Sequence, residues 1–134
     1  MVKNALPARL LFIVTVAGAA CGGPPKPVPV VPASEAPAPP PGTSWNCFEY
    51  RSSQATNSSC ERTLDECRTS SSEWANTPSY EAGTCQAQPQ AFCHHVWWSD
   101  GDKSLCFRDK ADCERDQNRM KTGYTKQTAC TAFD

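Results

Sequence analysis

The 134-residue chain lacks the features that mark several common classes of protein. It contains no run of 18 apolar residues, so we expect no transmembrane helix. The net charge is −1, which gives no electrostatic case for binding nucleic acid. Neither a P-loop nor a GxSxG, HExxH or GxGxxG pattern is present, so no catalytic motif or cofactor site is predicted. The sequence alone therefore assigns no specific activity.

Aliphatic side chains are scarce in the part of the chain expected to fold. Residues 45–134 contain only three Leu, Ile or Val residues, which are Leu64, Val96 and Leu105. Aromatic residues supply most of the remaining apolar bulk. The cysteine spacing described below divides this region into two repeats of about 45 residues each. Segments of that length rarely stabilise themselves by burial alone. Some other source of stability is therefore required.

Cysteine is abundant, with nine residues in the chain. No CxxC pair is present, which argues against a zinc site and against a redox-active dithiol. Each disulfide typically contributes ~2–4 kcal/mol. We therefore predict that eight cysteines form four structural disulfides in an oxidising compartment: Cys47, Cys60, Cys67, Cys85, Cys93, Cys106, Cys113 and Cys130.

The N-terminus has the layout of an export signal. Lys3 and Arg9 give a basic start, residues 10–17 are apolar, and three small residues precede Cys21. We predict that residues 1–20 are a signal peptide. This ending resembles the lipobox of bacterial lipoproteins, although Gly18 stands where that family prefers Leu. The resemblance implies cleavage before Cys21, acylation of that residue and, with Gly22 next, an outer-membrane location. A plain secretory signal, giving a secreted protein, is the alternative.

Residues 21–44 are predicted to be the acylated cysteine followed by a tether. Nine of the 12 prolines fall between residues 22 and 44. Such a segment is poor in backbone donors, so we expect neither a helix nor a strand ladder. In a polyproline II conformation, 23 residues reach ~70 Å at most. The segment is interpreted as a spacer that holds the domain clear of a membrane, with a PxxP ligand as the alternative.

The cysteine spacing indicates an internal duplication. The separations are 13, 7 and 18 residues from Cys47, and 13, 7 and 17 residues from Cys93. At the same offset of 46 residues, Arg62 matches Arg108 and Ser58 matches Ser104. We therefore predict two cysteine-rich repeats, residues 45–86 and 91–134.

Each repeat is predicted to have the order strand, strand, helix, strand, which gives a small, disulfide-rich α+β fold. Helices are expected over residues 64–75 and 110–122, because Thr63 with Glu66 forms a capping-box pattern and Asp109 with Asp112 is its equivalent. Gly123 suits the end of the second helix. Hairpin strands are expected over residues 45–51, 58–62, 92–98 and 103–108, with a turn at 99–102. Third strands are expected over 79–86 and 124–131.

A right-handed crossover would place each third strand beside the first strand of its repeat. The four cysteines of a repeat would then gather toward one end of a small sheet. Pairing within each repeat follows, although three connectivities per repeat remain open.

Both histidines lie in the first strand of the second repeat, close to carboxylates in the turn. His94 and His95 are adjacent, so their side chains should point to opposite faces of the strand and should not bind one metal ion together. We predict no metal site and no catalytic residue, and interpret both histidines as solvated. A weak ion site made by one histidine and a turn carboxylate is the alternative.

The paired tryptophans of the same strand are the more informative feature. One indole should fill the thin core, and the other should be covered by the sister repeat or exposed. An exposed aromatic side chain beside His and Asp suits carbohydrate or peptide binding. We therefore predict that a partner contacts the second hairpin around His95, Trp97, Trp98 and Asp100.

The whole arrangement resembles duplicated cysteine-rich modules in bacterial lipoproteins of unassigned function. The resemblance implies a membrane-tethered interaction module of the cell envelope, which requires no cofactor. Its expected partners are the membrane, through the lipid anchor, and an envelope protein or a carbohydrate. The alternatives are a small hydrolytic or metal-dependent enzyme that uses His94 or His95, and a structural envelope protein.

Overall fold

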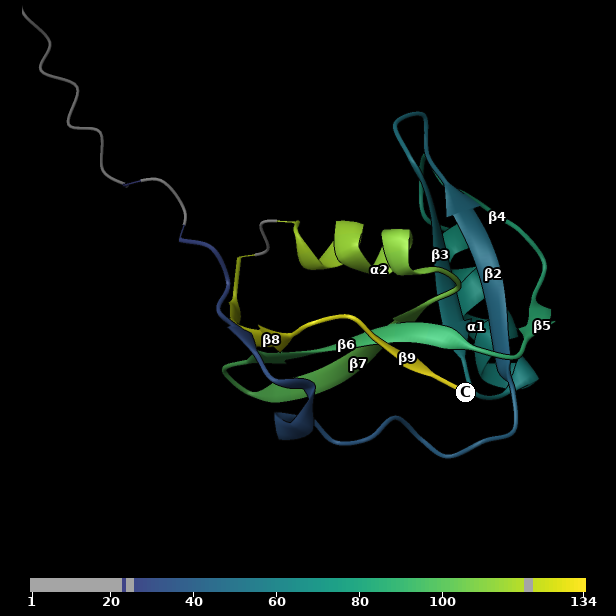
Figure 1. Cartoon of the computed structure of the whole chain (residues 1–134). Helices are drawn as coiled ribbons and strands as arrows, with labels where there is room; N and C mark the ends of the chain where they lie inside the picture. Colours follow the sequence, from purple (N-terminus) through teal and green to yellow (C-terminus); the bar gives the residue numbers. More distant parts are fainter. Residues whose placement is uncertain (1–22, 24–25, 120–121) are drawn as a thin grey trace, which may run out of the picture.

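The computed structural model describes residues 23, 26–119 and 122–134. It is a small mixed α/β structure with two sheets, two α-helices and four disulfide bonds (Figure 1). The predicted signal peptide, the acylation of Cys21 and the first residues of the tether lie outside the described residues. Among the described residues, no helix is long and apolar enough to cross a membrane.

The first half, residues 45–88, forms an antiparallel sheet with one helix against it. Its strands have the order β3-β2-β4, and β5 also pairs with β2. The elements are β2 (Trp45–Arg51), β3 (Thr56–Glu61), α1 (Leu64–Ala75), β4 (Glu81–Ala82) and β5 (Gln86–Gln88).

The second half, residues 91–134, has the same order of elements. In its sheet β6 lies between β7 and β8, and β9 also pairs with β6. The elements are β6 (Ala91–Trp98), β7 (Gly101–Phe107), α2 (Lys110–Gln117), β8 (Tyr124–Thr128) and β9 (Thr131–Phe133).

The first helix begins and ends where the sequence predicts. The Thr63 side chain accepts a hydrogen bond from the backbone N–H of Glu66 at 3.2 Å. The Glu66 carboxylate in turn accepts one from the Thr63 backbone N–H at 3.2 Å. This capping box is complete, so two backbone donors at the start of the helix are satisfied locally.

The second helix is shorter than the prediction of residues 110–122. The helix ends at Gln117, and the Asn118 N–H bonds back to the carbonyl oxygens of Glu114 and Asp116. Gly123 has a φ of 96°, but it lies in the turn before β8 instead of directly ending the helix. The predicted end was wrong because Asn118 caps the chain one turn earlier, where polar side chains favour leaving the helix.

The third strand of each half lies beside the first strand, as predicted, but its direction and continuity differ from the prediction. It runs antiparallel to the first strand, so the connection is not a parallel crossover. The helix returns the chain to the turn end of the hairpin, and the chain then runs back along the first strand. Each third strand is broken in two, with Cys85 or Cys130 in the gap. The disulfide from that cysteine to the helix holds the backbone away from the first strand, so the strand pairing is interrupted there.

The four disulfides are formed, and each joins cysteines of the same half. Cys47–Cys60 and Cys93–Cys106 each link directly paired residues of a hairpin, with Cα atoms 4.1 Å apart. Cys67–Cys85 and Cys113–Cys130 each link the helix to the third strand, with Cα atoms 6.1 Å apart. Four disulfides in so short a chain are typical of an oxidising, extracytoplasmic compartment.

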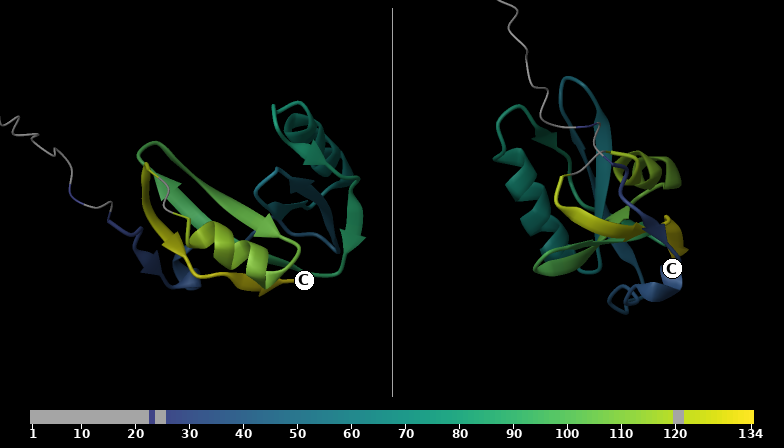
Figure 2. Two further views of the ribbon diagram at one scale, coloured as in Figure 1. Left: turned by 90° about the horizontal axis from the view of Figure 1, so that it is seen from above. Right: turned by 90° about the vertical axis from the view of Figure 1, so that its left-hand side faces the viewer.

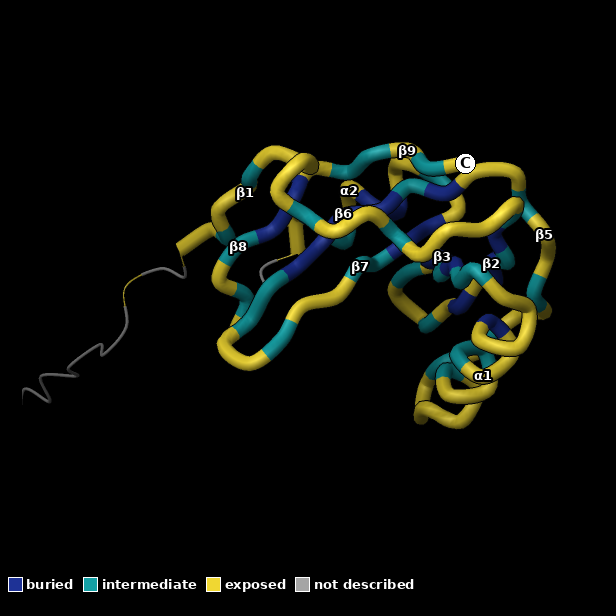
Figure 3. The backbone as a smooth tube through the Cα atoms, turned by 90° about the horizontal axis from the view of Figure 1, so that it is seen from below, coloured by how far each residue is buried: buried dark blue, intermediate teal, exposed yellow. Residues whose placement is uncertain are grey.

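Two small cores replace the missing aliphatic residues. One lies where the halves meet and is made of the two hairpin disulfides with Trp45 and Ala91, against which Phe133 packs. The other lies between the first sheet and α1 and contains Phe48, Tyr50 and Cys67. Buried positions are accordingly confined to the strands and the inner faces of the helices (Figure 3).

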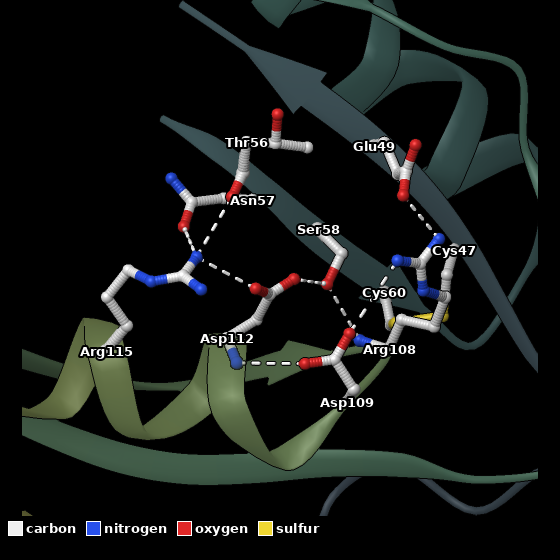
Figure 4. A network of polar contacts seen from close by, with 10 residues as sticks. All are labelled: Cys47, Glu49, Thr56, Asn57, Ser58, Cys60, Arg108, Asp109, Asp112 and Arg115. Atoms are coloured by element: carbon white, nitrogen blue, oxygen red, sulfur yellow. Dashed lines mark hydrogen bonds and ion pairs between the residues drawn. A yellow bond between two sulfur atoms is a disulfide. The ribbon is translucent and has the colours of Figure 1, made fainter. Parts of the chain in front are cut away.

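A polar network also joins the two halves (Figure 4). The sequence did not predict a functional role for any of the polar side chains in it. The Ser58 hydroxyl is fully buried and donates to the Asp112 carboxylate at 2.6 Å. The Ser58 oxygen accepts the Arg108 backbone N–H at 3.0 Å. Arg115 contacts the same Asp112 carboxylate at 2.9 Å, and Arg108 pairs with Glu49 at 2.6 Å. These hydrogen bonds and ion pairs therefore connect the two halves, mainly between β3 and α2.

The expectation that the proline-rich segment forms no strand or helix is wrong for residues 30–35. They belong to a longer stretch, residues 29–44, which is held against the domain and which we call the docked segment. It contains β1 (Val30–Val31), which pairs in parallel with β8, and the 3-10 helix Ala33–Glu35. Prolines donate no hydrogen bond but keep their carbonyl acceptors, and Gln127 N–H donates to Pro29 O at 2.9 Å.

The docked segment runs along the face of the second sheet that is opposite α2 (Figures 1 and 2). At its C-terminal end it is held by the Arg62 side chain, which donates to the carbonyl oxygen of Pro40 at 2.7 Å. The same guanidinium lies 3.7 Å from the centre of the Trp45 ring. Only the residues before Pro29 can therefore act as the predicted spacer.

Candidate functional site

The two histidines of β6 point to opposite faces of the second sheet, as their adjacency predicts. Both are buried, with 1% of His94 and 6% of His95 exposed, so the interpretation that they are solvated is wrong. They are buried because α2 covers one face and the docked segment covers the other. Within the described part of the chain, no group of three His, Cys, Asp or Glu residues is placed to hold a metal ion.

His94 is anchored to α2. Its Nε2 lies 2.9 Å from the Asp116 carboxylate, and its ring stacks on Phe107 with centroids 6.0 Å apart. Its Nδ1 has no hydrogen-bond partner among the described atoms.

His95 lies at the centre of a polar cluster on the opposite face. Its Nε2 is 2.7 Å from the Asp102 carboxylate, and its Nδ1 is 2.9 Å from the Ser104 hydroxyl. Ser104 stands directly opposite His95 in the hairpin register. Both ring nitrogens are thus engaged, which leaves no lone pair of His95 directed at a metal ion.

The docked segment forms one wall of a cavity of about 220 Å³ beside this cluster. The opposite wall includes His95, Ser104 and Thr128 from the second sheet. Thr128 Oγ1 accepts the His95 backbone N–H at 2.9 Å. The cavity is therefore a covered space beneath residues 33–39, and His95 does not lie on an open face.

The tryptophan pair and Asp100 lie at the tip of the second hairpin. The two indoles point to opposite faces, as predicted, but both are partly exposed. The prediction that one of them fills the core is therefore wrong, because the core clusters contain neither indole. Trp97 lies beside His95 with centroids 4.5 Å apart, and Lys126 lies 4.4 Å above the Trp97 ring. Trp98 packs beside Tyr124 at 6.3 Å. Asp100 is exposed in the turn, so of the four predicted contact residues only His95 is buried.

A larger hollow lies between the halves, which we call the inter-half cleft. Its volume is about 330 Å³, and its walls come from β3 and α1 on one side and from β7, β8 and the end of α2 on the other. The second hairpin contributes to the cleft through β7, from Lys103 to Phe107, and not through the residues of β6 that the sequence singled out. The residues that line this cleft are far apart in the sequence, so no local sequence pattern predicts the cleft.

Aromatic rings and charges of both signs line the inter-half cleft. Trp74 stacks on Tyr50 with centroids 4.0 Å apart. The cleft also holds the carboxylates Glu61 and Glu73 and the exposed cation Arg119. Aromatic walls with a few convergent polar groups are typical of small-ligand sites.

Tyr50 lies in the floor of the inter-half cleft as a neutral phenol. Burial raises the pKa of Tyr50 to about 12, and the nearby Asp116 carboxylate adds to the shift. Both causes disfavour the phenolate anion. Tyr50 therefore keeps its O–H as a hydrogen-bond donor well above neutral pH.

Comparison with protein-family models, curated proteins and solved structures finds no match to this chain. Its function must therefore be inferred from the chemistry of these side chains.

Proposed function

We propose that the protein is a lipid-anchored, extracytoplasmic binding module of the bacterial cell envelope, and that its ligand site is the inter-half cleft. The observation that carries this proposal is the pairing of aromatic rings with charges of both signs in one hollow of about 330 Å³. The export signal predicted for residues 1–20, with Cys21 directly after it, supports the location and the anchor.

The cleft chemistry favours a carbohydrate. The apolar face of a sugar ring packs on an aromatic side chain such as Trp74, and its hydroxyl groups accept and donate hydrogen bonds. Glu61 and Glu73 provide acceptors, and Arg119 provides donors. Opposite charges in one cleft do not select a strongly charged ligand. We therefore favour a neutral envelope glycan over a charged envelope protein.

We also propose that the halves arose by duplication of one cysteine-rich unit. The equal order of elements supports this, as do disulfides that span 13 and 18 residues in one half and 13 and 17 in the other. Matched positions have acquired different contacts. Ser58 binds across the interface, whereas Ser104 binds His95 within its own hairpin.

Co-sedimentation of the soluble protein with insoluble envelope glycan tests the binding role. The protein carries Cys21→Ser so that a lipid does not contribute. Glu73→Ala and Arg119→Ala should each weaken binding at least tenfold, because both side chains are exposed in the cleft. Arg68→Ala, an exposed arginine on α1 that is not part of the cleft wall, is the matched control and should bind normally.

If Arg119→Ala and Arg68→Ala bind the glycan equally well, the cleft is not the ligand site. Absence of binding to glycan, together with capture of an envelope protein that Arg119→Ala fails to capture, would replace the carbohydrate with a protein ligand. Binding of neither fraction would contradict the proposed role.

A hydrolytic role is the second candidate, because His95 bridges Ser104 and Asp102. A hydroxyl, a histidine and a carboxylate joined in this order can activate a serine nucleophile. A serine-reactive fluorophosphonate should then label the protein, and Ser104→Ala should abolish the labelling while Ser99→Ala, in the hairpin turn, should not. Labelling that is absent, or equal in both variants, rejects this role.

A further inference from the structure

We propose that the protein lies on the membrane with the tip of its second hairpin against the lipid surface. The contact surface is the end of this hairpin, where Trp97 on one face of the sheet and Trp98 with Tyr124 on the other face flank the turn. The docked segment fixes the position of this end relative to the anchor. This inference rests on the proposed acylation of Cys21 and adds the orientation of the domain.

The docked segment ties the chain to one end of the second sheet. Val30 and Val31 pair with Gln127 and Thr128 of β8. Pro29 accepts the Gln127 N–H at 2.9 Å, and Glu35 pairs with Lys126 at 3.2 Å. The chain therefore enters the domain at β8, on the side where the hairpin tip lies (Figures 1 and 2).

The distance from this entry point to the proposed anchor is short. Only residues 22–28 separate Cys21 from Pro29. A fully extended chain spans at most ~3.6 Å per residue, so eight steps reach roughly 29 Å. The spacer of ~70 Å expected from the whole proline-rich segment is thus reduced to less than half.

The hairpin tip is close to the entry point. Gln127 pairs with both Val30 and Val96, and Tyr124 pairs with Trp98 two residues further along β6. Neighbouring strands lie about 4.8 Å apart, so the two steps from β1 to β6 cover about 10 Å, and the two residues from Val96 to Trp98 add about 7 Å along the strand. An anchor on residue 21 therefore holds the tip and the entry point near the same membrane surface.

The side chains at the tip suit the membrane interface. Trp and Tyr are enriched at the level of the lipid headgroups, where an aromatic body and a polar edge are both solvated. Trp97, Trp98 and Tyr124 are each partly exposed, and Val30, which pairs with Gln127 of β8, is 55% exposed. The hydrophobic patch is small, so it supports contact with the surface and not insertion of the domain.

Fluorescence quenching by brominated lipid tests this orientation. The acylated protein is placed in vesicles of phosphatidylcholine that contains brominated acyl chains, and vesicle flotation confirms attachment. Trp97→Phe combined with Trp98→Phe should remove at least half of the quenching. Trp74→Phe, in the other half, should leave the quenching unchanged. Val31→Pro, which removes a backbone donor from β1, should reduce quenching because it releases the segment.

Amide hydrogen exchange provides a second measurement that needs no substitution. The hairpin turn at residues 99–101 should exchange at least threefold more slowly on vesicles than in the soluble Cys21→Ser protein. The turn of the first hairpin, residues 52–55, is the internal control and should exchange equally in both. Protein that floats with vesicles but shows neither quenching by brominated lipid nor protection of the tip overturns the orientation alone. Protein that does not float overturns the anchor as well.

Discussion

Replacement of Asp112 by alanine tests whether the polar network couples the two halves. Asp112 is 7% exposed and accepts hydrogen bonds from Ser58 at 2.6 Å and from Arg115 at 2.9 Å. A hydrogen bond to a charged group contributes about 1.5–3 kcal/mol, and an orphaned buried donor costs about 1–3 kcal/mol. These two effects overlap, because the same Ser58 hydroxyl is counted in both. We expect Asp112→Ala to lower the free energy of unfolding by about 2–4 kcal/mol.

Thermal unfolding with a double-mutant cycle measures this effect. At ~4 °C per kcal/mol for a domain of about 100 residues, the melting temperature should fall by roughly 8–16 °C. Ser58→Ala should add little once Asp112 is already Ala, with a coupling of at least 1 kcal/mol, on the order of the range for contacting residues. Asp65→Ala is the control, because its side chain is 96% exposed, and it should stay within about 0.5 kcal/mol. A loss below about 0.5 kcal/mol for Asp112→Ala, or full additivity with Ser58→Ala, would refute the coupling of the halves.

Three further outcomes follow from the same contacts. Full reduction of the disulfides should unfold the domain, because four losses of ~3 kcal/mol each exceed or match the stability of most domains of this size; near-UV circular dichroism and a cooperative melt that survive reduction would contradict this. Stability should fall as pH rises from about 10, the unfolded tyrosine pKa, toward about 12, the folded pKa of Tyr50. The unfolded state alone releases the proton in that range, so Tyr50→Phe should flatten the alkaline decline, and an unchanged decline would argue against a buried phenol. Arg62→Ala should increase protease cleavage within residues 36–44, because the guanidinium holds the Pro40 carbonyl, and unchanged cleavage would show that other contacts suffice.

Local signals in the sequence were sufficient for the elements that depend on neighbours in the chain. The capping box of Thr63 and Glu66 fixes where α1 begins. The hairpin of the second half follows from its turn residues and from strands that pair without a long loop. The disulfide partners could not be chosen from spacing, because all three pairings per half satisfy the same count of cysteines.

Features that depend on distant residues were not predictable from the sequence. The docked segment lacks apolar periodicity, and only the approach of β8 supplies the N–H that Pro29 accepts. Ser58 and Asp112 are 54 residues apart, so neither pattern nor propensity relates them. The inter-half cleft likewise needs both halves in place. The sequence instead predicts a face on β6, because aromatic residues are adjacent in sequence there.

Intact mass spectrometry of the mature protein from its native membrane tests the lipid anchor most directly, because the envelope location and the orientation on the lipid surface both depend on it. The expected species begins at Cys21, contains four disulfides and carries diacylglycerol on the Cys21 thiol with an acyl group on its amino group. A free Cys21 thiol, or a mature chain that begins at another residue, would contradict the anchor and would indicate a secreted protein.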